Sequence, residues 1–143
     1  MMPVTNIALI AVTRHGLEMA RRLRTRLGSG EIFRPAHLGD SAHVWEHPFA
    51  GPLSEQVPAL FGRCEQLVFF LAAGAVTRLI ASCLLSKTSD PGVLAVDEAG
   101  HFVVPLLSGH QGGANAFART VSGCLGATPV LKCISPSLLV CPQ

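Results

Sequence analysis

Residues 6–28, NIALIAVTRHGLEMARRLRTRLG, join a strand to a helix and thereby decide the fold class. The apolar run at 6–12 is continuous rather than alternating, which is typical of a parallel strand buried on both faces. After the turn TRHG, residues 17–27 have helical spacing, and Gly28 supplies a stop. One face of this helix is apolar, and we expect the opposite, arginine-rich face to be solvated. The residues are Ala20, Leu23 and Leu27 on the apolar face and Arg21, Arg22, Arg24 and Arg26 on the helix's charged side.

Strands and helices continue to alternate along the chain, which predicts an α/β fold with a mostly parallel sheet flanked by helices. Two apolar runs flank the polar turn DEAGH, so we expect one antiparallel hairpin near residues 93–106. The remaining elements are predicted as strands at 31–35, 66–72 and 129–133, helices at 53–64 (late-starting or kinked at Pro58), 75–85 and 114–126, and an irregular loop at 36–52.

The chain has 143 residues, enough for one domain with a substantial core. Hydrophobic residues make up 49% and charged residues only 14%, which indicates a surface that is either small or partly covered by further domains or by an oligomer. We expect one α/β domain at 1–133. The tail at 134–143 has no period of its own and is expected to be irregular or the start of a linker.

Charge and cysteine usage narrow the function classes. The net charge of +2 and the lack of a basic run argue against nucleic acid. The apolar segment 67–85 is long enough to span a membrane, but Arg78 lies inside it and a strand followed by a helix fits better.

The five cysteines match no zinc or haem spacing, which predicts reduced thiols in a cytoplasmic protein. Three histidines at 37, 43 and 47 share a loop without a cysteine or carboxylate pattern, so no metal site is predicted.

Three junctions lead from an apolar strand into a helix and carry glycine: 13–16, 72–78 and 107–115. In open α/β sheets, ligands bind beyond the carboxyl ends of the strands, and a helix N-terminus there favours an anion. None of the junctions matches a nucleotide-binding motif or the G-x-S-x-G elbow of a serine hydrolase. The sequence therefore predicts recognition of carboxylates or phosphates.

The side chains at these junctions suit acidic ligands. Arg14 and Arg78 are cations, His15 and His110 are titratable, and Ser108 and Asn115 are neutral hydrogen-bonding groups. A histidine beside a loop is more often structural than catalytic, but His110 is flanked by glycines at a helix entry. Asp90 and Asp97 lie near turns and are interpreted as turn formers.

Residues 71–131 resemble the N-terminal domain of the CbiG family, the cobalt-precorrin-5A hydrolases of cobalamin biosynthesis. The run PLLSGHQGGAN at 105–115 is long and specific for this family. The opening IALIAVTRHGLEMARRL is similar to the start of that family as well. Shorter matching elements are G-A-V-x-R at 74–78, D-P at 90–91 and V-D-E-x-G at 96–100.

The resemblance implies a step on the anaerobic route to vitamin B12. Family members open the δ-lactone of cobalt-precorrin-5A and release acetaldehyde, giving cobalt-precorrin-5B. The partner is then an anionic cobalt corrinoid edged with carboxylates, and no separate cofactor is expected because the substrate carries the cobalt. We expect His110 as acid/base, with Arg78 and the N–H groups around 109–113 holding the oxyanion or carboxylates. The expected substrate-binding residues are Arg14, Gly74, Ser108, Gly109, Gly112, Gly113 and Asn115.

Proteins of this family continue past this domain, so the chain is expected to act as the N-terminal part of a larger enzyme. A second hypothesis is a non-catalytic corrinoid-binding module that acts with a separate C-terminal partner. A third is an unrelated small α/β anion-binding protein. Ser108 as a covalent nucleophile stays open, since no base is identifiable beside it.

Overall fold

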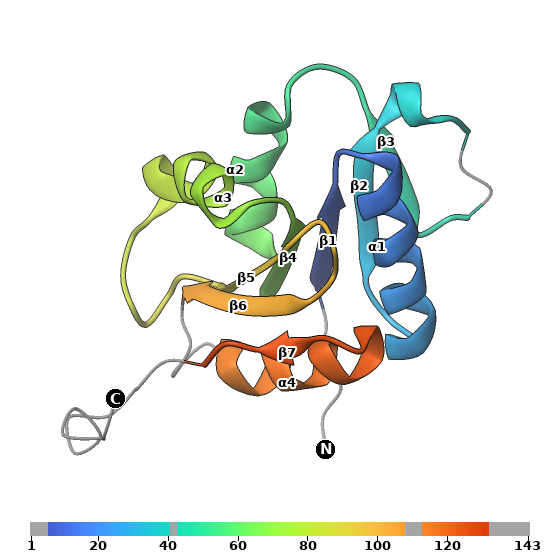
Figure 1. The fold of residues 1–143 in the computed structure, drawn as a ribbon. Coiled ribbons are helices and arrows are strands. Elements are labelled where there is room, and N and C mark those ends of the chain that lie inside the picture. The colour runs from blue at the N-terminus through green and yellow to red at the C-terminus, as the bar shows by residue number, and fades with distance from the viewer. Residues whose placement is uncertain (1–5, 41–42, 108–112, 132–143) are drawn as a thin grey trace, which may run out of the picture.

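One seven-stranded sheet forms the centre of the computed structural model, which describes residues 6–40, 43–107 and 113–131 (Figure 1). The strand order is β3-β2-β1-β4-β5-β6-β7, and every neighbouring pair is parallel except β5 and β6. The predicted mostly parallel sheet with one antiparallel hairpin is therefore confirmed. The strands are β1 (Ile7–Ala11), β2 (Glu31–Pro35), β3 (Glu46–Phe49), β4 (Gln66–Phe70), β5 (Gly92–Val96), β6 (Phe102–Leu107) and β7 (Thr128–Pro129).

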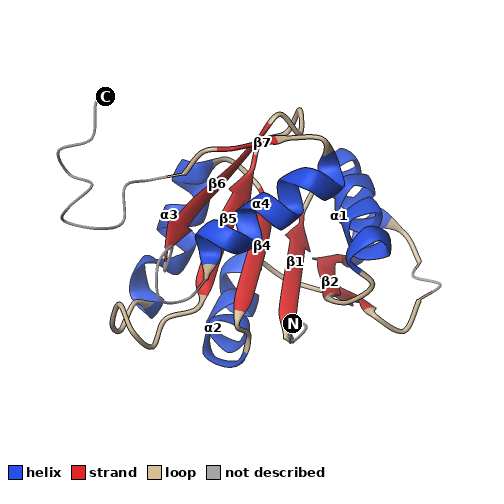
Figure 2. Cartoon of the chain, turned by 90° about the horizontal axis from the view of Figure 1, so that it is seen from below, coloured by secondary structure: helices blue, strands red, loops and turns tan. Residues whose placement is uncertain are grey.

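Helices cover both faces of the sheet, giving three layers (Figures 1 and 2). Helices α1 and α4 pack against one face and against each other, while α2 and α3 pack against the other face. The helices are α1 (Arg14–Leu27), α2 (Leu53–Arg63), α3 (Ala73–Ile80) and α4 (Ala114–Leu125), with short 3₁₀ turns η1 (Ala36–Leu38) and η2 (Ala81–Cys83).

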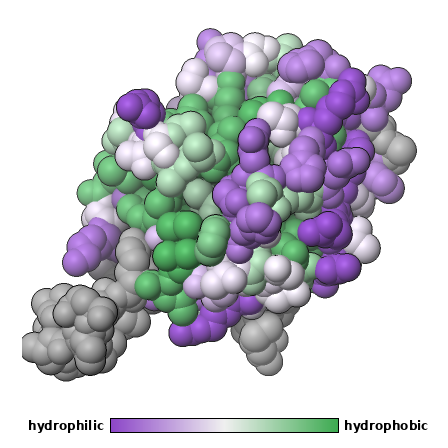
Figure 3. Space-filling view, in the orientation of Figure 1, coloured by the Kyte–Doolittle hydropathy of each residue, from purple (hydrophilic) through white to green (hydrophobic). Residues whose placement is uncertain are grey.

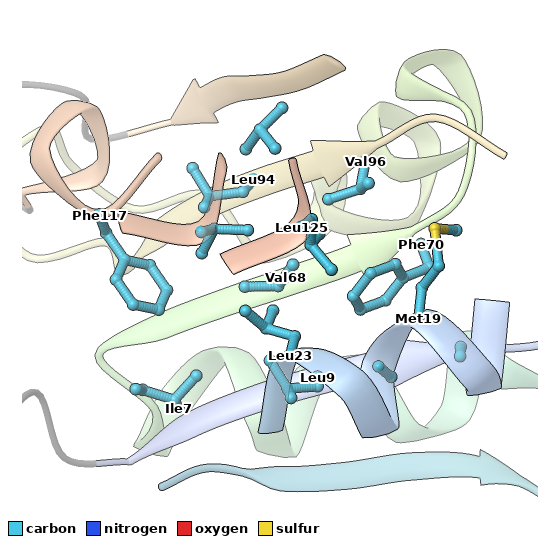
Figure 4. Packing of buried hydrophobic residues seen from close by; sticks show 14 of the residues in the cluster. Ile7, Leu9, Met19, Leu23, Val68, Phe70, Leu94, Val96, Phe117 and Leu125 are labelled. Carbon is cyan, nitrogen blue, oxygen red and sulfur yellow. The ribbon is translucent and has the colours of Figure 1, made fainter. Parts of the chain in front are cut away.

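Both faces of the central strands are buried, which explains their unbroken apolar sequences. In β1, Leu9 points toward α1 and α4, while Ile10 points toward α2 and α3. On the first of these faces, Leu23 and Phe117 close over Val68 (Figure 4). Fully burying one such aliphatic side chain is worth about 1.5–3 kcal/mol, so these two clusters supply most of the driving force for folding.

The direction of the strands fixes which loops share an edge of the sheet. The chain winds outward from β1 to β3, then returns to the other side of β1 as β4, so β1 and β4 flank a topological switch point. Helices α1 and α3 begin at this carboxyl edge. Strand β6 runs antiparallel to β5 and therefore ends at the opposite edge, where α4 begins.

The predicted end of α1 is confirmed, and other boundaries shift. Thr13 caps the helix by accepting a hydrogen bond from Gly16 N at 3.0 Å, so α1 begins at Arg14 rather than at residue 17. Gly28 ends it with φ of 73°, a conformation that glycine adopts without strain. Helix α2 begins at Leu53 with Pro58 exposed inside it, so the late start does not occur. Helix α3 ends earlier than predicted, and β7 is shorter.

The prediction of an irregular loop at 36–52 is wrong, because this stretch contains η1 and strand β3. Strand β3 lies at the edge of the sheet and has the sequence EHPF, which lacks an apolar run. A proline is tolerated there because an edge strand has one row of unpaired backbone groups. Ion pairs of Glu46, and not burial of an apolar run, hold this strand in the sheet.

A buried ionic network ties α1, β2 and β3 together. The Glu46 side chain is inaccessible and accepts hydrogen bonds from Arg21 Nε and Nη2 at 3.0 and 2.6 Å and from Arg34 Nε at 3.1 Å. Arg34 is fully buried and also donates to the backbone oxygens of Pro35 and Gly39. Because Arg34 and Glu46 are removed from water, each depends on the other for compensation, and the partly exposed Arg21 adds a second positive charge beside Glu46.

The expectation of a solvated arginine face on α1 is therefore wrong in part. Arg21 bonds to Glu46. In addition, the guanidinium carbon of Arg24 lies 4.6 Å from the ring centroid of Trp45. Arg22 and Arg26 donate to the backbone oxygens of Leu125 and Cys124 near the end of α4. Long arginine side chains can reach such partners while their stems cover apolar surface.

The Glu46 network makes stability depend on pH. Hydrogen bonds from Arg21 lower the pKa of Glu46 below its ordinary value of 4.5; burial opposes this, and Arg34 adds to the lowering. A carboxyl whose folded pKa is lowered stabilises the fold above its unfolded pKa and loses that contribution as the pH falls through the folded value. We expect urea denaturation to show a constant Glu46 contribution from pH 5 to pH 7 and a loss below about pH 4.5. An identical acid profile in Glu46→Gln would contradict this.

Candidate functional site

The structure divides the predicted site residues between two edges of the sheet. Arg14 opens α1 and Gly74 lies in the first turn of α3, both at the carboxyl edge of the parallel strands. Gly113 and Asn115 lie at the start of α4, at the opposite edge. Helices α3 and α4 also cover opposite faces. The four further predicted residues, Ser108, Gly109, His110 and Gly112, lie outside the described residues.

The carboxyl edge presents exposed cations. Arg14 and His15 are exposed at the start of α1, whose first turn is already capped by Thr13. Helix α3 begins after Ala72 with no side-chain cap, and Arg78 reaches back along the helix so that its Nη1 donates to Gly74 O at 3.3 Å. These groups can attract anions, but solvent screens them.

The start of α4 has no cap from the part of the chain that the structure describes. Gly113 precedes the helix with φ of 76°, and no described side chain bonds to its first N–H groups. The first backbone bond of the helix runs from Phe117 N to Gly113 O, so the preceding N–H groups have no acceptor within the helix. The helix dipole and these donors favour an acceptor oxygen or an anion at this place.

Three buried polar side chains lie at this edge of the sheet, two of them at the helix start and one in the loop before β5. Gln66, Asp90 and Asn115 are exposed by only 4%, 7% and 8%. Gln66 opens β4 opposite Gly92, the first residue of β5, and its Nε2 lies 3.9 Å from where a Cβ on Gly113 would be. The Oδ1 of Asn115 is buried and accepts no hydrogen bond from any described residue. A buried acceptor of this kind costs free energy unless a water or a ligand donates to it.

Asp90 and Asp97 act as the turn formers predicted from the sequence. Both carboxylate oxygens of Asp90 lie 3.1 Å from Leu85 N, which fixes the loop between η2 and β5. Asp97 accepts from Phe102 N at 2.6 Å and closes the turn between β5 and β6. Asp90 thereby brings β5 to the edge where α4 begins.

Sequence reasoning missed Gln66 and Gly92. The available signal was a glutamine opening an otherwise apolar buried strand, QLVFF. A Cβ on Gly92 would lie 2.1 Å from Gln66 Oε1 and 2.8 Å from its Cδ, so the carboxamide occupies the space that the glycine leaves. Gly92 therefore leaves room for the Gln66 carboxamide, which lies beneath the start of α4.

We expect Gly92→Ala to lower the free energy of unfolding by about 1–3 kcal/mol, because the new methyl group overlaps the buried Gln66 carboxamide. In a Gln66→Ala background the same change should cost less than about 0.5 kcal/mol. Gly62→Ala, in an exposed part of α2 with nothing within 4 Å, is the matched control and should not destabilise. Equal costs of Gly92→Ala in both backgrounds, measured by urea denaturation, would refute the contact.

The remaining histidines and cysteines do not form a centre among the described residues. His43 stacks on Trp45 with ring centroids 4.2 Å apart, and His47 Nε2 lies 2.5 Å from Glu31 Oε1. No three His, Cys, Asp or Glu side chains gather as metal ligands within 6–40, 43–107 and 113–131. Burial raises the pKa of the Cys64 thiol, which makes this cysteine a poor nucleophile. None of the helices in the described ranges is long and apolar enough to cross a membrane.

The chain is similar in sequence to proteins of cobalamin synthesis. The sequence model of the family "Cobalamin synthesis G N-terminal" matches residues 55–135. A cobalt-precorrin-5A hydrolase from Priestia megaterium is 35% identical over 138 residues, which are 93% of this chain and 37% of that protein. The enzyme of the same name from Salmonella typhimurium is 37% identical over 126 residues, 88% of this chain and 35% of that protein. The chain thus spans about a third of the length of these curated relatives.

A solved structure supports the fold. The crystal structure of a cobalamin biosynthesis protein G homologue from Sulfolobus solfataricus superposes with a TM-score of 0.68 over 96% of this chain and 40% of that chain. The two sequences are 23% identical, so the likeness concerns the arrangement of helices and strands.

Proposed function

This chain belongs to the cobalamin synthesis G N-terminal family, and we propose that it acts as the N-terminal part of a cobalt-precorrin-5A hydrolase. Two relatives of that name, 35% and 37% identical over most of this chain, support the proposal. The substrate is a cobalt corrinoid edged with carboxylates, and the cobalt belongs to the substrate. The reaction takes place in the cytoplasm, where the cysteines stay reduced.

The proposed reaction consumes one water. Water attacks the lactone carbonyl, the ring C–O bond breaks, and the released carboxylate stays on the macrocycle. A base then removes the proton of the freed hydroxyl, the oxygen forms the C=O bond of acetaldehyde, and the adjacent carbon–carbon bond breaks. The electron pair of that bond stays on the macrocycle, which is cobalt-precorrin-5B. The enzyme must hold an oxyanion in the first step and move a proton in both.

The observation that carries the proposal is the start of α4, which no side chain of the described ranges caps and which lies above buried amides. Its N–H groups suit a carboxylate or the developing lactone oxyanion, and Gly113 lets a ligand approach the backbone closely. The buried Oδ1 of Asn115 is an acceptor that can orient the attacking water. The sequence leading into this helix is the PLLSGHQGGAN run that characterises the family resemblance.

His110 is the proposed acid/base, and Ser108, Gly109 and Gly112 complete the substrate-binding run with Gly113 and Asn115. The proposed role of Arg78 is narrower than the sequence suggested. Helices α3 and α4 cover opposite faces of the sheet, and this arrangement favours a carboxylate of the substrate over the oxyanion as the partner of Arg78. We assign Arg78, with Arg14 and Gly74, to peripheral carboxylates.

A second candidate function is corrinoid binding without catalysis, as a module that acts only with another part of the enzyme. The observation behind it is the start of α4, whose N–H groups and buried amides suit binding, whereas the proposed base His110 lies outside the described residues. In this case the remaining part of the enzyme supplies the base as a separate subunit. Binding of the corrinoid is common to both candidates, whereas acetaldehyde release separates them.

We expect Asn115→Leu to weaken binding of cobalt-precorrin-5A by about tenfold or more, because it removes the buried acceptor beside the helix start. Arg119→Ala, an exposed change on the same helix, is the control and should bind normally. Binding is read from the corrinoid absorbance, and thermal melting verifies that the variants fold. Normal binding by Asn115→Leu together with loss in Arg78→Ala would move the site to the carboxyl edge.

A further inference from the structure

One side of the molecule is apolar, and no element among the described residues covers it. It lies on the α3 face of the sheet, beyond α3, where β6 and β7 form the end of the sheet. Leu85 is 85% exposed, and Leu84, Phe102 and Val130 are 47%, 48% and 42% exposed. We call this surface the α3-side apolar face; its residues are Leu84, Leu85, Phe102, Val104, Leu106 and Val130.

Strand alternation places these side chains on a common side. Val103 packs into the core under α4, so Phe102 and Val104 project from the other face of β6. Phe102 pairs with Thr128. Val130 follows β7 two residues after Thr128, and its N–H donates to Val103 O, which continues the same row. Leu106 packs at the margin of the core under α2 and α3. Helix α3 has only eight residues and is too short to cover this row.

The segments that contribute the α3-side apolar face lack charged side chains. Residues 79–86, 102–107 and 120–131 contain no Asp, Glu, Lys or Arg. Hydrophobic colours accordingly gather around α3, the loop after it and the end of β6, whereas hydrophilic colours cover the side with α1 (Figure 3). Monomeric proteins rarely expose a continuous apolar surface of this kind without a partner.

We infer that the α3-side apolar face is the docking surface for the rest of a cobalt-precorrin-5A hydrolase. The inference rests on the proposed function. The matched relatives contain about two-thirds of their length beyond the part shared with this chain. In a family defined by its N-terminal position, that remainder follows β7 along the chain, and β7 lies in this face. A short connection therefore suffices to bring the remainder onto it.

The proposed docking surface borders the proposed site. Strand β6 runs across the face and ends at Leu107, directly before the SGHQGG run. A partner seated on the face would lie beside the start of α4 and close the site from water. The hydrolase site is then completed by two parts of the enzyme, and exclusion of water strengthens the electrostatic interactions within it.

The test joins this chain, as a whole, to the remaining two-thirds of the Priestia megaterium relative in one polypeptide. Hydrogen exchange of residues 79–86 and 102–107 is compared with that of the chain alone. We expect protection in the joined protein, and loss of that protection in Leu85→Asp and Phe102→Asp. Val44→Asp is the matched control, because Val44 is 89% exposed on the other side of the molecule and should not matter.

Unchanged exchange at these residues in a folded joined protein would overturn the inference. Sedimentation of the isolated chain gives a second, independent test: we expect a monomer, and a dimer that Leu85→Asp dissolves would assign the face to a second copy instead. Corrinoid binding is measured separately. Protection of the face without corrinoid binding would refute the proposed function and leave the docking surface standing.

Discussion

Replacing Glu46 by Gln should lower the free energy of unfolding by about 3–5 kcal/mol. The substitution keeps the shape of the side chain but removes the negative charge that compensates Arg21 and Arg34. Arg34 is fully buried and cannot turn to water, so its charge would stay in the interior without a counterion. Such a loss is a large part of the stability of a small domain.

Urea denaturation at pH 7 measures this effect, and Glu31→Gln is its matched control. Glu31 pairs with His47 on the same two strands, but both side chains are about half exposed, so this change should cost less than about 1 kcal/mol. The double variant Arg34→Met/Glu46→Leu should recover much of the loss, because it replaces the buried charges by apolar groups. A cost below 1 kcal/mol for Glu46→Gln would show that the network does not carry β3.

Replacing His110 by Ala in the complete enzyme should lower kcat for acetaldehyde release by about 10²–10⁴-fold. This is the range expected when a positioned acid/base is removed and substrate binding is retained. Because we propose that His110 transfers protons and does not anchor the substrate, KM should change little, and the pH profile should lose the limb that reports this group.

His37→Ala is the control for this variant. His37 is exposed on η1, remote in the sheet order from the start of α4, and its removal should leave kcat and KM unchanged. Single-turnover measurement of acetaldehyde separates chemistry from product release. Full lactone-opening activity in His110→Ala would remove His110 from the mechanism and leave Ser108 and Asn115 as the groups to examine.

The helices and the central strands were predictable because hydrophobic burial decides them. Strands such as β1 and β4 are buried on both faces, and their continuous apolar runs are visible in the sequence. Strand β3 was missed because Glu46 holds it through arginines that are 12 and 25 residues away. A contact between charged residues at such separations leaves no local pattern in a single sequence.

The grouping of the site residues was not predictable from the junctions alone. All three junctions follow a strand and carry glycine, but β6 runs antiparallel, and this reversal moves the 107–115 junction to the opposite edge from Arg14 and Gly74. Gln66 contributes to that edge through its contact with Gly92, which depends on the register between β4 and β5. Register is a tertiary property, fixed by which faces are buried.

The central claim is that this chain supplies the corrinoid-binding N-terminal part of a lactone-opening enzyme. Its most direct test is acetaldehyde release from cobalt-precorrin-5A by the polypeptide that joins this chain to the remaining two-thirds of the Priestia megaterium relative. We predict one acetaldehyde for each cobalt-precorrin-5B formed, and none from that remainder alone. A folded joined protein that neither binds cobalt-precorrin-5A nor releases acetaldehyde would contradict the claim.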